Sequence, residues 1–410
     1  MLRRQLLHFG AFTLGGLPVS LVQAQGGVQK KLVVVMLRGA VDGLSVVAPY
    51  GEREYAASRP QIALGPPGAD DGLIKLDSLF GLHPSLAPLK RHWDGGQLAF
   101  VHASGSPDPT RSHFDAQDYL ESGTPGRKST PDGWMNRLLS ALPGEPAPTR
   151  AISQGSTPPR IFAGMASVAT LGLGPNAMQR RAIDNPQMQA SLAKLYAGDA
   201  QLSSTLRDTT QSRTEMNRSM AAAEPRSMDP TADAGAPSAR SFAADARRLG
   251  QLIRKDPHTQ LAFTAVGGWD THVNQGAARG QLANRLASLG EGLYALSQGL
   301  GDTYKDTVIV VISEFGRTLR QNGNGGTDHG RGNVIWLMGG PVAGGQVLGE
   351  WPGLDASALA DGRDLAVRTD FRQVLSPLLQ RHLGLSETAL ATVFPNAPQT
   401  WRYADRLLRA

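Results

Sequence analysis

Five short runs of apolar residues recur along the chain, and each leads into a loop of glycine and polar residues. They cover residues 30–36, 97–102, 260–266, 306–312 and 333–338. Segments with a helical pattern lie at residues 112–121, 241–255, 280–300 and 369–383. Continuous apolar runs of this length are typical of strands buried on both faces. Strands that alternate with helices predict an α/β fold, in which a mainly parallel sheet lies between helices on both faces.

The first 24 residues resemble a removable export signal. Arg3 and Arg4 precede an apolar stretch at 6–22, and residues 22–24 (Val-Gln-Ala) have the pattern that precedes signal cleavage. The two arginines also resemble a twin-arginine signal, which exports folded proteins; a plain secretory signal and a surface helix are the alternatives. We expect segment 1–24 to be removed and residues 25–410 to form a single α/β domain, periplasmic or secreted.

Composition excludes several kinds of chemistry. The chain has no cysteine, which excludes thiol catalysis and thiolate metal sites. Its net charge of +6 comes from scattered basic residues, so no nucleic-acid partner is expected. After the first segment, no stretch approaches the ~20 apolar residues that a membrane span needs. Between residues 201 and 240 polar residues dominate, and the apolar periodicity disappears after Met220. This predicts a flexible insertion within the domain, with residues 221–240 as a mobile surface loop or cap.

Acidic and imidazole side chains follow the predicted strands. In parallel sheets, ligands bind beyond the carboxyl ends of the strands. The loops there offer Asp42; Ser112, His113 and Asp115; Asp270 and His272; Glu314; and Asp328 and His329. Carboxylates and neutral imidazoles bind divalent metals. Each residue alone could be an ordinary turn residue. Their shared location instead predicts one or two ions of Zn, Mn or Ca, held by Asp42, Asp270, His272, Glu314, Asp328 and His329.

Ser112 precedes a predicted helix, where the free backbone amides of the first turn face an anion. A serine beside a metal ion can attack phosphorus or sulfur. Thr110 is a second candidate nucleophile, and Arg111 could hold the non-bridging oxygens of a substrate. Arg317 could also bind an anionic group. The alternatives are a plain helix cap for Ser112 and a salt bridge to Glu314 or Asp328 for Arg317.

Five stretches of the chain resemble the bacterial "domain of unknown function 1501" family. They are residues 111–117 (RSHFDAQ), 268–272 (GWDTH), 313–318 (SEFGRT), 328–329 (DH) and 364–372 (DLAVRTDFR). The family is similar to the alkaline phosphatase and sulfatase superfamily. The resemblance therefore implies that fold, and metal-dependent hydrolysis of phosphate or sulfate esters.

The resemblance also implies a two-metal site. One metal would be held by Asp42 with the nucleophile Ser112, and the other by Asp270, His272 and His329. Glu314 stands where the superfamily usually has an Asp followed by a His, and Phe315 replaces that His. The second metal site is therefore expected to be altered or lost.

Two hypotheses follow for the function. In the first, the protein is an exported metal-dependent hydrolase of a small-molecule or glycan ester. In the second, it is a catalytically silent periplasmic protein, which binds a ligand or a partner protein through the same cleft.

Overall fold

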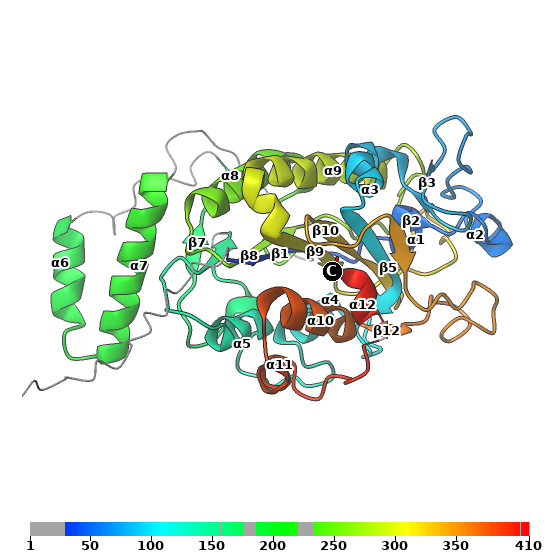
Figure 1. The fold of residues 1–410 in the computed structure, drawn as a ribbon. Helices are drawn as coiled ribbons and strands as arrows, with labels where there is room; N and C mark the ends of the chain where they lie inside the picture. The colour runs from blue at the N-terminus through cyan, green and yellow to red at the C-terminus, as the bar shows by residue number, and fades with distance from the viewer. Residues whose placement is uncertain (1–28, 156, 175–185, 220–232, 402, 410) are drawn as a thin grey trace, which may run out of the picture.

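The computed structural model describes residues 29–155, 157–174, 186–219, 233–401 and 403–409. Its centre is a nine-stranded sheet with the order β11-β5-β10-β9-β1-β8-β6-β7, and β12 pairs with β5 (Figure 1). The strands are β1 (Lys31–Leu37), β5 (Leu98–Gly105), β6 (Ala151–Gln154), β7 (Ala169–Leu171), β8 (Leu261–Val266), β9 (Thr307–Ser313), β10 (Asn333–Gly339), β11 (Gln346–Leu348) and β12 (Thr369–Asp370). β10 is antiparallel to β5 and β9, and the other pairs in this sheet are parallel. The predicted mainly parallel α/β sheet is confirmed.

Helices cover both faces of this sheet (Figure 1). One face carries α3 (Lys90–Asp94), α8 (Phe242–Lys255) and α9 (Gln281–Leu300). The other carries α4 (His113–Ser122), α5 (Trp134–Ala141), α10 (Phe371–Leu383), α11 (Glu387–Val393) and α12 (Ala404–Leu407). Alternate residues of β1 serve the two layers, because Val33 packs in one core with Leu289 of α9 and Val34 in another with Leu378 of α10. A strand buried on both faces needs the continuous apolar run seen in the sequence.

A small lobe follows β1. It contains α1 (Gly43–Val46), α2 (Arg53–Ser58) and a three-stranded sheet of β2 (Val47–Ala48), β4 (Gly81–Leu82) and β3 (Ile74–Lys75). On the opposite side of the molecule, α6 (Pro186–Leu195) and α7 (Ala200–Ser219) stand away from the sheet (Figure 1).

The structure describes part of the predicted insertion and none of the predicted export signal. The first half of segment 201–240 forms helix α7, and residues 220–232 lie outside the described residues. Segment 1–24 also lies outside them, so export remains a prediction. None of the helices in the described part combines the length and the apolar character that a membrane crossing requires.

The direction of β10 positions the functional loops. Asn333, at the start of β10, pairs with Ser104 near the end of β5. The loop that precedes β10 therefore lies at the same edge as the loops that follow β5, β8 and β9.

Candidate metal centre

Three segments bring acidic and imidazole side chains to this carboxyl edge. His113 opens α4, which follows β5. Asp270 and His272 lie in the loop after β8, and His329 lies shortly before β10. These residues span more than half of the chain, so only the sheet topology places them together.

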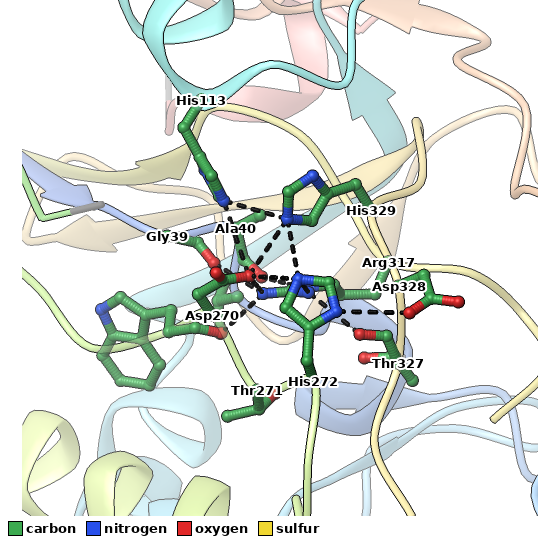
Figure 2. Close-up of polar contacts among 12 residues, drawn as sticks. Gly39, Ala40, His113, Asp270, Thr271, His272, Arg317, Thr327, Asp328 and His329 are labelled. Carbon is green, nitrogen blue, oxygen red and sulfur yellow. Dashed lines mark hydrogen bonds and ion pairs between the residues drawn. The ribbon is translucent and has the colours of Figure 1, made fainter. Parts of the chain in front are cut away.

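The side chains of these four residues converge (Figure 2). Oδ1 of Asp270 lies 3.0 Å from Nε2 of His272, 3.1 Å from Nε2 of His329 and 3.5 Å from Nε2 of His113. Nε2 of His329 lies 3.0 Å from Nε2 of His272 and 3.1 Å from Nε2 of His113. In the described part of the chain, one group of potential metal ligands has three members this close: His113, Asp270 and His329. We call these three residues together with His272 the metal centre.

Each imidazole of the metal centre has a second partner, on the nitrogen that faces away. These outer contacts are His113 Nδ1 with Glu314 Oε1 at 2.8 Å, His272 Nδ1 with Asp328 Oδ1 at 3.2 Å, and His329 Nδ1 with the backbone oxygen of Arg111 at 2.8 Å. Hydrogen bonds of this kind from the outer nitrogen are the usual second contact of metal-binding histidines.

The outer partners determine where each neutral ring carries its hydrogen. Carbonyl and carboxylate oxygens only accept hydrogen bonds, so the hydrogen is assigned to Nδ1. The Nε2 atom of His329 then faces those of His113 and His272, and all three face Asp270, while Nη1 of Arg317 lies 3.5 Å from Nε2 of His272. Such an arrangement requires added protons or a cation. Imidazole nitrogens with a carboxylate oxygen are a donor set that suits Zn and other transition metals. The residues present therefore fit a divalent metal ion.

The charges of the surrounding groups also favour a cation. Burial opposes ionisation of Glu314, but hydrogen bonds from His113 and Gln117 hold the pKa of this carboxyl below its usual value. Burial likewise opposes ionisation of Asp270, but hydrogen bonds from His113 and His329 hold its pKa far below the ordinary range. Both carboxylates are ionised at neutral pH. They outweigh the effect of burial on His113 and raise its pKa to about 9.

Arg317 lies beneath the metal centre, with its side chain fully buried. Its three nitrogens donate to Asp270 and to the backbone oxygens of Gly39, Ala40, Trp269 and Thr327, at 2.5–3.1 Å (Figure 2). It joins three loops and orients Asp270 for the metal centre. In this structure the guanidinium of Arg317 is enclosed and already paired, and binding of a substrate anion by Arg317 stays a prediction. The salt bridge of Arg317 is to Asp270, and not to Glu314 or Asp328 as the alternative expected.

A family comparison covers most of this chain. The family model described as "Protein of unknown function (DUF1501)" matches residues 29–394. The chain belongs to the DUF1501 family. A comparison with curated proteins finds no match to it.

Solved structures resemble this DUF1501 protein weakly. A structure described as Ps i-CgsB in complex with k-i-k-neocarrahexaose is 12% identical, with a TM-score of 0.43, and the match covers 92% of this chain and 76% of that one. A protein of the alkaline phosphatase superfamily from Vibrio parahaemolyticus is 11% identical, with a TM-score of 0.39 and coverage of 91% and 71%. The lipoteichoic acid synthase LtaP from Listeria monocytogenes is 10% identical, with a TM-score of 0.37 and coverage of 88% and 74%. Likenesses this weak say nothing about activity.

Asp42 does not join the metal centre of this DUF1501 protein. Its buried carboxylate pairs with the Arg59 guanidinium through contacts of 2.6 and 3.0 Å. Ser45 and Gln275 donate to the same carboxylate at 2.7 and 2.8 Å. A guanidinium lies beside Asp42, where the resemblance implies a metal ion, and the role of Asp42 as a metal ligand stays a prediction.

Glu314 and Asp328 lie beside the metal centre and orient its rings. Besides His113, the Oε1 atom of Glu314 accepts from the Gly39 amide at 2.7 Å and from Gln117 at 3.0 Å. Asp328 accepts from His272 and from Asn322, and the hydrogen bond from Asn322 is the main cause of its lowered pKa. Both residues were expected to be ligands. Their contacts instead give them the role of acceptors for the outer nitrogens.

Ser112 is exposed and caps α4, as its sequence context predicts. Its hydroxyl accepts from the Asp115 amide at 3.4 Å. Its own amide donates to the Thr110 hydroxyl at 3.2 Å. The next residue is His113, so the hydroxyl and the metal centre are adjacent along the chain.

The side chain of Arg111 was expected to hold the non-bridging oxygens of a substrate, and in this structure it contacts two carboxylates. Its guanidinium pairs with Asp364 at 2.5 Å and with Asp361 at 3.1 Å, so that two carboxylates already neutralise it. The backbone oxygen of Arg111 contacts the metal centre, through His329. The residue therefore orients a ligand, and its side chain is not free for a substrate oxygen in this structure.

His113 is the member that the sequence-based ligand set leaves out. It follows the N-cap of α4, which places its ring at the carboxyl edge of the sheet. The ring of Phe315 stacks on it, with centroids 4.9 Å apart. The available signal was an imidazole one residue after a helix cap, beyond a buried strand. A histidine is absent at position 315, and an imidazole from α4 occupies this part of the site.

Proposed function

We propose that the protein is an exported, metal-dependent hydrolase that cleaves a phosphate or sulfate ester. One observation carries the proposal: three imidazoles and Asp270 converge with their outer nitrogens already hydrogen-bonded. The outer hydrogen bonds orient the three rings as in a metal site, and a purely structural cluster would have no evident use for this orientation. The ester class rests on the resemblance to the phosphatase and sulfatase superfamily, and export rests on the first 24 residues.

Each residue of the proposed active site has a separate role. His113, His272, His329 and Asp270 would hold one divalent ion, which supplies positive charge for the ester oxygens and for a nearby hydroxyl. Ser112 caps the ten-residue helix α4, and backbone amides at a helix start attract anions. Ser112 is therefore the candidate nucleophile, with Thr110 as the second candidate. Glu314 and Asp328 keep the imidazole hydrogens on Nδ1, so that the Nε2 lone pairs remain available.

The donor set narrows the choice of metal. Three imidazole nitrogens suit Zn, Mn or Fe, whereas Ca²⁺ takes oxygen ligands. We therefore expect Zn or Mn in preference to Ca. The pairing of Asp42 with Arg59 leaves one carboxylate fewer for a second ion, so a single metal ion is expected.

Metal analysis together with an ester screen tests the proposal. The protein purified from the periplasm should contain about one equivalent of transition metal, and it should hydrolyse p-nitrophenyl phosphate, its diester or the sulfate. His329→Ala and Asp270→Asn should lose metal and activity together. His258→Ala, which changes an exposed histidine outside the metal centre, is the matched control and should retain both. Tightly bound metal with no hydrolysis of the three esters would contradict the activity.

A silent binding protein is the second candidate, and the Asp42–Arg59 pair favours it. In an active two-metal enzyme this carboxylate would be needed by a metal ion, but here a buried arginine neutralises it. If the protein neither contains nor takes up metal, this second function becomes the better one.

A further inference from the structure

A cavity of about 430 Å³ lies beside the metal centre. Its walls come from α4, from the ends of β6 and β8, and from segments 157–160 and 234–237. This volume lies within the range of ligand pockets. The first wall residue on α4 is Phe114, the neighbour of the metal-centre residue His113. Gln117, also in the wall, donates to the Glu314 carboxylate that contacts His113, so the cavity lies one residue away from the metal centre.

Two polar groups in the wall have no partner among the described residues. The Ser153 hydroxyl is fully buried, lines the cavity and makes no hydrogen bond. Nη1 of Arg160 is also buried without a partner, although the other nitrogens of this guanidinium bind Asp118 and the Thr130 carbonyl. Buried polar groups are normally satisfied, so these two indicate that a polar ligand or water completes them.

The charged residues of the wall cancel in pairs. Arg38 pairs with Glu121 at 2.7 Å, and Arg160 pairs with Asp118 at 2.7 Å. Each pair combines one positive and one negative side chain, so the wall as a whole offers polar contacts without net charge. Such a wall suits a neutral ligand that both donates and accepts hydrogen bonds. A second anionic group would meet two carboxylates here.

Phe114 adds an apolar surface at the rim. It is 84% exposed, whereas large apolar side chains are usually covered. An exposed aromatic ring at the rim of this pocket gives a flat face on which the C–H side of a sugar ring can pack. Hydroxyl groups on the sugar edges would at the same time meet Ser153 and Arg160.

We propose that this cavity binds a neutral sugar unit, and that the ester cleaved at the metal centre is carried by a carbohydrate. The second half of this statement rests on the proposed hydrolase function, whereas sugar binding itself does not. The Ser153 hydroxyl and Arg160 bind the sugar hydroxyls, and Phe114 packs against the ring. The substrate class of the enzyme is then a phosphorylated or sulfated glycan.

Saturation-transfer NMR on the full chain tests the binding. The probes are the methyl glycosides of glucose, galactose, mannose, fucose and N-acetylglucosamine, each with and without chelator. At least one should bind in both conditions, because no wall residue belongs to the metal centre. Ser153→Ala and Phe114→Ala should each weaken binding about fivefold or more. Ser376→Ala, a buried serine on α10 outside the cavity, and Met165→Ala, an exposed apolar residue, should leave it unchanged.

The outcomes separate this inference from the proposed function. Sugar binding without ester hydrolysis would support the cavity and contradict the hydrolase. Hydrolysis of p-nitrophenyl esters with no binding of the five sugars would contradict the cavity alone. If the protein both binds a sugar and hydrolyses esters, the phosphate or sulfate ester of that sugar should be hydrolysed with a higher kcat/KM than the p-nitrophenyl esters. Ser153→Ala should remove that preference.

Discussion

The hydrogen bonds from the outer nitrogens of the imidazoles should influence metal affinity, as the ligands of the proposed metal centre do. Glu314 is the most enclosed of these acceptors, and Glu314→Gln would keep its shape while removing its charge. The side-chain oxygen of the glutamine can still accept from His113, and its amide NH2 group can donate to the Ser313 hydroxyl. We predict metal affinity about 10–100-fold lower, as for other losses of an outer partner. Competition with a chelating dye measures this. Glu387→Gln, on exposed α11, is the control, and equal affinities in the two variants would contradict the role of Glu314.

Asp42 has a structural role that its sequence context did not reveal. Removing one partner of a buried ion pair leaves an unpaired buried charge and typically costs about 3–5 kcal/mol. We therefore predict that Asp42→Ala lowers the free energy of unfolding by about this amount, without changing the metal content of the folded protein. Urea unfolding and elemental analysis measure the two quantities. Asp94→Ala, which breaks an exposed pair with Lys90, should cost less than about 1 kcal/mol. Loss of metal in folded Asp42→Ala would restore Asp42 as a ligand.

A buried histidine outside the metal centre makes stability depend on pH. Burial lowers the pKa of His102 to about 4, and its ring donates to the Val47 carbonyl and accepts from the Ala103 amide. The unfolded chain binds this proton near pH 6.5, so stability falls as the pH drops from 6.5 to 4. When the pH is lowered from 7.5 to 5, this residue should reduce the free energy of unfolding by about 2 kcal/mol. Urea unfolding at both pH values should show a smaller loss in His102→Gln, and an unchanged loss in exposed His258→Gln. Equal losses in all three proteins would contradict this.

At the level of single residues, the sequence predicted which chemistry was available but not which atoms would pair. The imidazoles and Asp270 were recognisable from their place after apolar runs. Arg59 gave no such signal, because its contact with Asp42 depends on how the small lobe folds back on the sheet.

At the level of elements, the fold could be predicted because its strands are buried on both faces. The apolar runs of β1, β8 and β9 leave no ambiguity about period or length. Helix α7 was not predicted, because polar residues dominate its sequence and α6 beside it buries no residue. A helix without an apolar face lacks the periodicity on which such a prediction depends.

Helix α4 allows the structural and chemical roles of Ser112 to be separated. Ser386 caps α11 with the same contact, an amide three residues later, and is a matched control. Ser112→Ala and Ser386→Ala should each cost about 1 kcal/mol of stability. If Ser112 is the nucleophile, only Ser112→Ala should also reduce kcat by about a thousandfold or more. Thermal denaturation and ester hydrolysis measure the two effects. Full activity in Ser112→Ala, with loss in Thr110→Ala, would assign the nucleophile to Thr110.

At the level of the whole molecule, the metal centre ties together the loops after β5 and β8 and the loop before β10. Its ligands lie between positions 113 and 329, so the centre can form only after the sheet has paired. For this reason the sequence could suggest the ligands but not the number of metal ions. That number depends on two contacts across the fold, the pairing of Arg59 with Asp42 and the stacking of Phe315 on His113.

A ligand that binds only the folded state stabilises it by mass action, by about 4 kcal/mol at a thousand times its Kd. We therefore predict that Zn²⁺ added to chelated protein saturates at one equivalent and raises Tm by several degrees. His113→Ala should remove most of this metal-dependent rise, because it removes one ligand of the centre. His258→Ala should retain it, which excludes nonspecific binding to surface histidines. Calorimetry at two metal concentrations measures the shift. Saturation at two equivalents would mean that Arg59 gives way to a second metal ion at Asp42, and that the protein has the two-metal site of the superfamily it resembles.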